Sequence, residues 1–562
     1  ALMEPPFSEA LAEFLKVQPP DLSKNVSPET LENLYTQALT GEDLETLDLP
    51  RHLAPALGRG LPRRYSQMDP TKCHVKESFT PIPLLRLLRI EKPIFFLYGQ
   101  QKFPHKAKIG ILTWVIADGI GDYFTQQEAA NELLETFPDL YLISIVHKDS
   151  PALPLHPKCP HYLLHYSGKL NHPIIHEAFS EELLTKLSQT DLILELSTPF
   201  PYMIGLVSSL KKHNPTLKHQ RIGEHSLIES LDFEPSTGAR CMGLHALEMG
   251  IFSKKATFVR SPILQLQHRP LLQLLFSSNT VEDYLRSHSF NLAYTRTFRG
   301  TYLYLHILCK GLSEEEKNID LCFFKLELML KVVNDRLTIP VLKEWKIGKV
   351  LIYLKNQVIP ITISNTPKTL RLIHCPELTQ HDVHILFSFT EHLIGCKGDQ
   401  TLCEAICSGV PFFYDPPHFK KGILKDLLFL AESRLPQCPL KTFFKLLLKN
   451  PHVSHEKSDG EWVSEDYIQS ENDRLSLEED CDEKIGDSLA PLIKNPQFKE
   501  GFPQLREIIQ REYSFEPLLK GMINRHLFHQ RFPSLMRQEQ KGLSQFVNGN
   551  TSAVDFLKEF IN

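Results

Sequence analysis

The stretch at residues 392–411 holds the residues best suited to bind a phosphorylated ligand. It reads HLIGCKGDQTLCEAICSGVP, which predicts a short strand, a glycine turn and a helix that begins with Asp399. The N–H groups at the start of a helix have no acceptor within the helix, and they attract anions. We therefore expect the turn at residues 397–401 to hold a diphosphate.

Glu404 lies one turn into the predicted helix. A carboxylate at that position can accept hydrogen bonds from the hydroxyls of a ribose, so the stretch predicts a nucleotide ligand. Gly409 is expected to end the helix before the next buried strand. The predicted donor-binding residues in this stretch are Lys397, Gly398, Asp399, Gln400, Thr401 and Glu404.

The order of these residues resembles the donor-site motif of the GT-B glycosyltransferase superfamily. The matching pattern is Gly398-x-x-Thr401-x-x-Glu404-Ala405, followed by Ser-Gly-Val-Pro at residues 408–411. The resemblance implies that the turn contacts the diphosphate of a nucleotide-sugar donor, that the Glu binds the ribose, and that no metal cofactor is required. The other interpretation is a strand–loop–helix unit of any α/β protein, with a Glu on its surface.

Cys396 marks a departure from the retaining branch of that superfamily, whose motif has a second Glu eight residues before the Glu-Ala pair. The resemblance therefore implies an inverting mechanism. In such a mechanism the acceptor attacks the anomeric carbon directly, and a base of the protein removes the proton of the acceptor.

A second stretch, ADGIGD at residues 117–122, follows a predicted strand. Its glycines, Gly119 and Gly121, permit a tight turn and a close approach of a ligand to the backbone. The spacing of Asp118 and Asp122 resembles the corresponding loop of the bacterial protein-arginine rhamnosyltransferases, in which paired aspartates lie beside the acceptor. The resemblance implies that one of these two aspartates is the general base.

Two alternatives to this interpretation of the loop stay open. Asp122 is well placed to cap a helix that begins at Tyr123, without any catalytic role. A dinucleotide-binding loop is the second alternative, but Phe124 stands where its third glycine should be, which argues against an NAD-dependent function.

Further charged residues are weaker candidates for the same site. Glu224 and His225 come shortly after a His- and Lys-rich turn and are an alternative source of the base, although a His in such a place is more often structural. Arg296 follows a predicted strand and suits the phosphates, because its charge offsets the charge of a leaving diphosphate. Arg299 competes with Arg296 for this role.

The elements that must position these residues alternate between strands and helices. Such alternation predicts two α/β, Rossmann-like domains with parallel sheets, facing a central cleft. Strands are expected at residues 109–116, 140–146, 162–165, 191–196, 290–294, 349–354, 369–374 and 411–414, and helices at residues 123–137, 181–188 and 202–213.

The predicted organisation has five parts. An accessory helical region at residues 1–100 precedes an acceptor domain at 101–265 and a donor domain at 266–450. An acidic loop or disordered insertion at 451–490 and C-terminal helices at 491–562 complete the chain.

The accessory regions are compatible with a protein acceptor. The rival functions are a sugar-nucleotide epimerase or hydrolase, and a non-catalytic scaffold that binds a protein partner.

The composition is ordinary for a globular enzyme, with 42% hydrophobic and 23% charged residues. Residues 455–487 contain 13 acidic and 3 basic residues, so the rest of the chain carries +5 against a total of −5, too little to predict a nucleic-acid partner. The 11 cysteines form no CxxC pair, which indicates reduced thiols and no zinc site. We find no membrane span or signal peptide and expect a cytoplasmic location, with a specialised route of secretion into a host cell left open.

Overall fold

The computed structural model describes most of the chain after residue 80. The described residues are 81–101, 106–115, 120–168, 174–198, 210–225, 240–245, 248–254, 258, 260–277, 279–416, 422–449, 481–547, 549–551, 555–556 and 559. Most of the predicted accessory region and most of the predicted acidic loop, residues 1–80 and 450–480, lie outside them.

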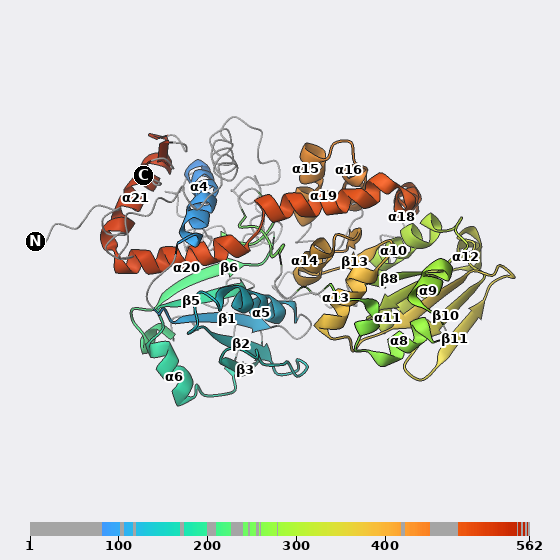
Figure 1. Ribbon diagram of the computed structural model, residues 1–562, viewed down its shortest axis with the longest axis horizontal. Helices are drawn as coiled ribbons and strands as arrows, with labels where there is room; N and C mark the ends of the chain where they lie inside the picture. The colour runs from blue at the N-terminus through green and yellow to red at the C-terminus, as the bar shows by residue number, and fades with distance from the viewer. Residues whose placement is uncertain are drawn as a thin grey trace, which may run out of the picture. The chain divides into compact units, whose positions relative to one another are not determined.

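The chain divides into two compact units (Figure 1). The first unit consists of residues 1–252 together with residues 513–562, and the second consists of residues 253–512. The domain boundaries predicted at residues 265 and 450 both fall inside the second unit. The C-terminal helices are shared, because one of them belongs to the second unit and the last two to the first.

The first unit contains a seven-stranded sheet in the order β4-β3-β2-β1-β5-β6-β7. All described pairs are parallel except β3 with β4. The strands are β1 (Ile109–Val115), β2 (Tyr141–His147), β3 (His161–Ser167), β4 (Ile174–Ile175), β5 (Leu192–Thr198), β6 (Lys218–Gly223) and β7 (Arg240–Cys241).

Helices cover both faces of this sheet, as a parallel sheet of nearly continuous apolar strands requires. One face packs Ile109 and Leu194 against helices of three separate parts of the chain, and the other packs Leu112 and Ile193 against Leu183 and Leu187. The helices are α4 (Pro81–Gly99), α5 (Gly121–Leu133), α6 (Glu181–Ser188), α20 (Glu516–Arg531) and α21 (Pro533–Val547).

The second unit repeats this architecture with a sheet in the order β11-β10-β12-β9-β8-β13-β14, in which only β10 and β11 pair antiparallel. The strands are β8 (His288–Ala293), β9 (Asn318–Phe323), β10 (Lys349–Tyr353), β11 (Val358–Thr362), β12 (Thr369–His374), β13 (Ile394–Cys396) and β14 (Phe412–Tyr414). The predicted fold class, two α/β units with Rossmann-like sheets, is therefore confirmed. The central cleft between them stays a prediction.

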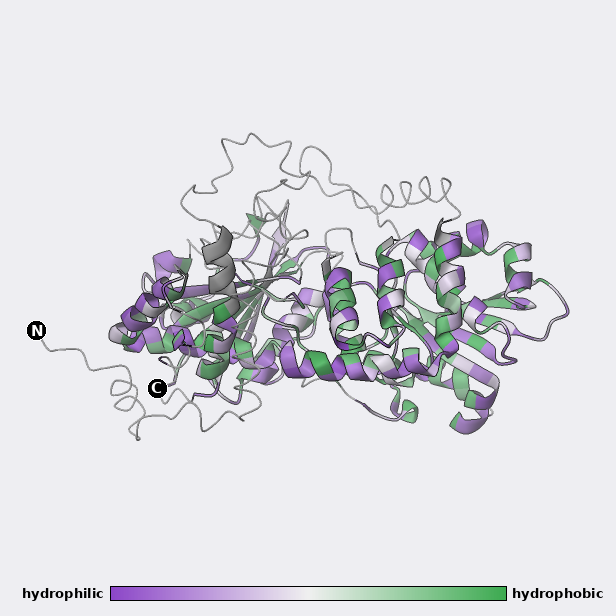
Figure 2. Ribbon diagram, turned by 90° about the horizontal axis from the view of Figure 1, so that it is seen from above, coloured by the Kyte–Doolittle hydropathy of each residue, from purple (hydrophilic) through white to green (hydrophobic). Residues whose placement is uncertain are grey.

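The helices of the second unit carry both hydrophobic and hydrophilic residues, as the coloured helices in Figure 2 show. This mixture is expected for helices that cover a sheet with one face. They are α8 (Arg269–Phe276), α9 (Val281–Ser287), α10 (Phe298–Gly311), α11 (Leu326–Arg336), α12 (Ile339–Glu344), α13 (Gln380–Phe389), α14 (Asp399–Ser408), α15 (Gly422–Arg434), α16 (Leu440–Lys449), α18 (Cys481–Leu489) and α19 (Pro496–Glu512), with short 3-10 helices at Ile263–Gln265 and Ala490–Lys494.

The predicted elements mostly match these bounds. The helix predicted at residues 181–188 and the strand predicted at 369–374 are confirmed with the same bounds, whereas α5 begins at Gly121, two residues before the predicted start. Of the helix predicted at residues 202–213, only residues 210–213 are described, and they are helical. Strands β4, β6, β7, β9 and β11 were not among the predicted strands.

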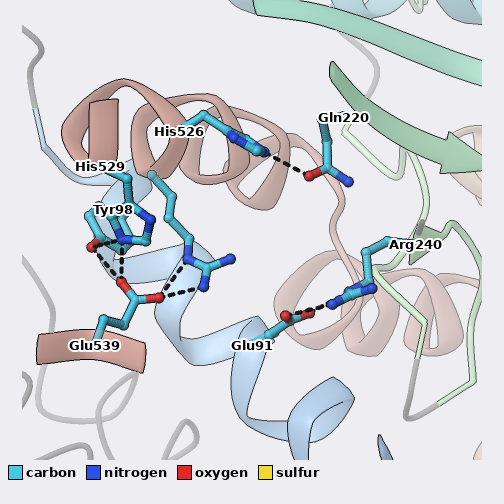
Figure 3. A network of polar contacts seen from close by, with 8 residues as sticks. Glu91, Tyr98, Gln220, Arg240, His526, His529 and Glu539 are labelled. Atoms are coloured by element: carbon cyan, nitrogen blue, oxygen red, sulfur yellow. Dashed lines mark hydrogen bonds and ion pairs between the residues drawn. The ribbon is translucent and has the colours of Figure 1, made fainter. Parts of the chain in front are cut away.

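Helix α4 belongs to the first unit because it packs closely on α20. A Cβ atom on Gly521 would collide with the carbonyl of Phe95, so only glycine permits this approach of the two backbones. Buried polar contacts add to the packing (Figure 3). Arg240 pairs with Glu91, and its Nη2 atom donates to Oε1 at 2.6 Å.

Glu539 of α21 is the centre of a second buried group in the same figure. Its carboxylate accepts hydrogen bonds from Tyr98 Oη at 2.7 Å and from Arg525 Nε at 2.6 Å, and His529 Nε2 lies 2.8 Å away. Burial alone would raise the pKa of Glu539, but the charge of Arg525 and the hydrogen bonds lower that pKa to about 2. The Glu539 carboxylate thus joins α4, an early helix of the chain, to α20 and α21, which are the last two.

We expect Glu539→Gln to lower the free energy of unfolding of the first unit by about 3–5 kcal/mol at pH 7, because it leaves Arg525 buried without its counter-charge. The pKa of Glu539 is lower in the folded than in the unfolded state, so its contribution is present above about pH 4.3 and is lost as the pH falls toward 2. Urea denaturation of wild type and variant at pH 7 and at pH 3 measures both effects. Glu182→Gln, at an exposed carboxylate bonded to Tyr162, is the control and should change stability by less than about 0.5 kcal/mol. An equal effect of the two substitutions would contradict the prediction.

Candidate functional site

The turn predicted to hold a diphosphate connects β13 to α14. Gly398 takes the cap position with φ −116° and ψ 170°, and the N–H group of Leu402 makes the first helical bond, to the Gly398 carbonyl at 3.0 Å. The Thr401 hydroxyl accepts from the N–H groups of Lys397 at 3.3 Å and Gly398 at 3.2 Å. Gly409, with φ 72°, ends the helix. The predicted strand, turn and helix are confirmed.

Space is open above the turn at Gly398. Among the residues that the structure describes, a Cβ atom built on Gly398 would meet nothing nearer than the Thr401 hydroxyl oxygen, at 4.0 Å. The backbone of Gly398 is extended, a conformation that any residue adopts. The glycine is therefore not required by the fold of the turn, and it leaves room for a ligand at the N-terminus of a ten-residue helix.

Helix α10 has its N-terminus at the same edge of the sheet, but a side chain fills it. Asp415, which follows β14 and is fully buried, accepts from the N–H groups of Arg296 at 2.7 Å and Thr297 at 2.8 Å and from the Thr297 hydroxyl at 3.0 Å. A Cβ atom on Gly300 would collide with this carboxylate. The chain supplies its own anion to α10, and no local pattern in the sequence indicates this.

Glu404 lies in the interior and not on the surface, so the surface-Glu interpretation is wrong. The residue is 3% exposed. Its Oε1 atom receives hydrogen bonds from Gln400 Nε2 at 2.8 Å and from Gln380 Nε2 at 3.3 Å, and His384 Nε2 lies 3.0 Å from it. Three nitrogen atoms thus surround one carboxylate oxygen.

A pocket opens beside this helix at the carboxyl ends of β8 and β9. Its lining residues are Ala293, Tyr294, Thr295, Thr301, Phe323, Phe324, Lys325, Leu328, Met329 and Lys397. The rings of Tyr294 and Phe324 stack with their centroids 3.4 Å apart. Burial raises the pKa of Tyr294, and the charge of Glu404 raises it further.

Sequence reasoning missed Tyr294, Phe324 and Lys325 as site residues. Tyr294 and Phe324 each directly follow a strand, β8 and β9, and ligands of open α/β sheets bind beyond the carboxyl ends of the strands. The sequence concealed this position, because β9 was not predicted and Tyr294 was assigned to the strand at residues 290–294. Lys397 lines the pocket and is also the first residue of the predicted turn at residues 397–401.

The two arginines that competed for the phosphate role differ in exposure. Arg296 is partly exposed, and its backbone N–H group is held by Asp415. Arg299 is 2% exposed and lies in the first turn of α10. Arg296 is the more accessible of the two arginines, and we keep it as the candidate for contact with the phosphates.

The candidates for the base lie in the first unit. Asp118 and Gly119 fall outside the described residues. Gly121 and Asp122 are the first two residues of α5, and Ile120 is its cap residue, so the interpretation of Asp122 as a cap is wrong. Glu224 and His225 follow β6, and His225 is buried. Because β1 and β6 both run parallel to β5, Asp122 and Glu224 lie at the same edge of this sheet.

Two features are missing from the part of the chain that the structure describes. None of the helices in it is both long and apolar enough to cross a bilayer. Among the same described residues, no three His, Cys, Asp or Glu side chains gather in a way that could hold a metal ion.

Comparison with known proteins finds similarity to solved structures only. No protein-family model matches the chain, and no curated protein sequence matches it. A glycosyltransferase from Rickettsia africae is 10% identical, with 75% of this chain and 98% of that chain covered and a TM-score of 0.33. An alpha-glucosyltransferase in complex with UDP and DNA is 10% identical over 75% of this chain and 99% of that one, with a TM-score of 0.36. A UDP-N-acetylglucosamine 2-epimerase from Listeria monocytogenes is 11% identical. The match covers 71% of this chain and 94% of that chain, with a TM-score of 0.31. All three likenesses are distant.

We expect Asp415→Ala to destabilise the second unit by about 1–3 kcal/mol, because the N–H groups of Arg296 and Thr297 lose their buried acceptor. Asp415→Asn, which retains one acceptor oxygen, should cost less. Urea denaturation measures the free energy of unfolding. The control is Asp335→Ala, at an exposed position, which should stay within about 0.5 kcal/mol of wild type. If Asp415→Ala unfolds at the same urea concentration as wild type, the carboxylate does not stabilise the N-terminus of α10.

Proposed function

We propose that this protein is a glycosyltransferase that moves a sugar from a nucleotide diphospho-sugar to an acceptor by an inverting mechanism that needs no metal. The observation that carries the proposal is the N-terminus of α14, which is open at Gly398 and borders a pocket through Lys397. A helix N-terminus of this kind favours phosphate groups, through its N–H groups and its partial positive charge.

Charge at the edge of the sheet supports a diphosphate as the ligand of this turn. Lys397 and Lys325 both line the pocket, and Arg296 follows β8. The rival position for an anion, the N-terminus of α10, already holds the Asp415 carboxylate. Between α10 and α14, α14 is the helix whose first turn leaves room for an anion from solution at a glycine.

Glu404 supports a nucleotide and not a simple phosphate. A carboxylate repels phosphate but accepts hydrogen bonds from sugar hydroxyls. It lies five residues after the first residue of α14, which is roughly 7.5 Å along the helix axis. A ligand bound along α14 therefore meets donors for an anionic group first and an acceptor for hydroxyls one turn later.

The proposed reaction has one bond-forming and one bond-breaking event at the anomeric carbon. The acceptor atom attacks this carbon, the bond from it to the diphosphate oxygen breaks, and the carboxylate of Asp118 or Asp122 takes the proton of the acceptor. The negative charge that develops on the leaving diphosphate is stabilised by the α14 N–H groups, Lys397 and Arg296. A protein acceptor is part of the proposal, and the length of the accessory regions is the feature of the sequence that is compatible with it.

We expect Gly398→Val to abolish binding of the donor while leaving the fold intact. The extended backbone at this position accepts any residue, and the added methyl groups occupy the space in which the diphosphate is proposed to bind. A thermal-shift panel of UDP-, GDP- and dTDP-sugars tests this prediction. A donor at 100 times its dissociation constant stabilises wild type by about 2.7 kcal/mol, and the shift should vanish in the variant. Thr362→Val, on the exposed edge strand β11, is the matched control and should keep the full shift.

The panel also separates the proposal from its rivals. A wild-type protein that responds to no nucleotide sugar would contradict the proposal and favour a scaffold that binds a protein partner. Conversion of a bound nucleotide sugar without any acceptor would favour an epimerase or hydrolase.

We expect Asp118→Asn or Asp122→Asn to lower kcat by about 10²- to 10⁴-fold, because the amide cannot take a proton, while the affinity for the donor stays near that of wild type. Steady-state transfer assays and calorimetry with the donor give the two quantities. Asp139→Asn, an exposed aspartate of the same unit, serves as the control. Full activity of a double Asp118→Asn, Asp122→Asn variant would exclude both residues as the base.

A further inference from the structure

Two polar side chains of α13 reach the carboxylate of Glu404 on α14. Gln380 and His384 lie one turn apart, and their Nε2 atoms are 3.3 Å and 3.0 Å from Oε1 of Glu404. Gln400, from the first turn of α14 itself, donates to the same oxygen at 2.8 Å. The orientation of the carboxylate is thereby tied to a neighbouring helix as well as to its own.

The contact between His384 and Glu404 is buried on both sides. The side chains of His384 and Glu404 are 1% and 4% exposed. A carboxylate without hydrogen bonds is costly at such depth, so the donors are needed to keep it there. The nitrogen of a His that faces a carboxylate oxygen carries a proton, so Nε2 of His384 is the donor.

The imidazole ring of His384 is held in turn by an aromatic contact. The ring of Phe258 lies against it, with centroids 4.8 Å apart and an angle of 37° between the planes. The ring is therefore held on one side by Phe258 and through Nε2 by Glu404. A side chain with two such restraints holds its hydrogen-bond partner in one orientation.

We propose that His384 is a positioning residue that holds the Glu404 carboxylate in the orientation needed to accept hydrogen bonds from the ribose of the donor. This inference depends on the proposed function. With three donors on Oε1, the carboxylate cannot rotate about its bond to Cγ, and the place of Oε2 is set with it. His384 acts on the nucleoside part of the ligand through Glu404, and it leaves the diphosphate part to the turn at residues 397–401.

The experiment compares two probes that differ only in whether they carry a nucleoside. Inorganic pyrophosphate tests the turn alone, and UDP, GDP or dTDP, whichever wild type binds most tightly, tests the turn together with Glu404. We expect His384→Phe to weaken binding of the nucleoside diphosphate by about tenfold and to change binding of pyrophosphate by less than about twofold, since one buried hydrogen bond to a charged group is lost. Calorimetry gives both dissociation constants.

Three further variants separate positioning from packing. His384→Gln retains an amide donor and should restore most of the affinity. Phe258→Leu removes the aromatic contact but leaves the donor, and it should have a smaller effect than His384→Phe. Gln380→Leu removes a second donor to Oε1 from the partly exposed end of α13, so it reports on the same carboxylate if His384→Phe does not fold.

A double variant provides the decisive comparison. In a Glu404→Ala background, His384→Phe should cause no further loss of nucleoside diphosphate affinity, because the residue acts through Glu404. An additional loss there, an equal loss for pyrophosphate, or no loss in His384→Phe itself would overturn the inference while leaving the proposed function intact. Wild-type protein that binds neither probe would overturn the proposed function and the inference together.

Discussion

The unsatisfied N–H groups at helix N-termini are the constraint on which the rest of the candidate site in the second unit depends. Parallel strands place the following helices with their N-termini at one edge of the sheet, so α10 and α14 both present partial positive charge there. The chain treats them differently. It closes α10 with the buried Asp415 and leaves α14 with a glycine and open space. The same electrostatic feature of the fold is thus satisfied by a side chain at α10 and left open at Gly398 of α14.

Buried carboxylates join parts of the sequence that lie far apart, and each is held by several donors. Asp415 joins the end of β14 to the start of α10, Glu404 joins α14 to α13, and Glu539 joins α21 to α4 and α20. Such groups favour one arrangement of their elements, because any other arrangement leaves a buried charge without hydrogen bonds. This is why the helix that contains the predicted donor motif has a defined orientation, and why α4 belongs to the first unit.

Local patterns were sufficient to predict much of the fold and the turn before α14. The apolar runs at β1, β2 and β12 and the glycine turn at residues 397–398 depend on neighbours in sequence, so their elements follow from the residues themselves. Strand β9 was missed because Asn318 and Asp320 interrupt its apolar run, and Asp320 is satisfied by Arg371 and Tyr284 from elsewhere in the chain. The partners of Glu404 and Asp415 were missed for the same reason. They come from segments that only the tertiary structure brings together.

The order of chemical groups along α14 supports the proposed class of ligand more strongly than the motif does. A site for free phosphate needs donors and cations but has no use for a buried carboxylate one turn away, whose charge repels the anion. Burial of Glu404 there has a desolvation cost, which the hydrogen bonds of Gln380, His384 and Gln400 offset. A ligand with an anionic group at one end and hydroxyls at the other makes use of both halves of the helix. A nucleoside diphosphate has this order. In a nucleotide-sugar donor bound in this way, the transferred sugar would extend from the diphosphate, away from Glu404.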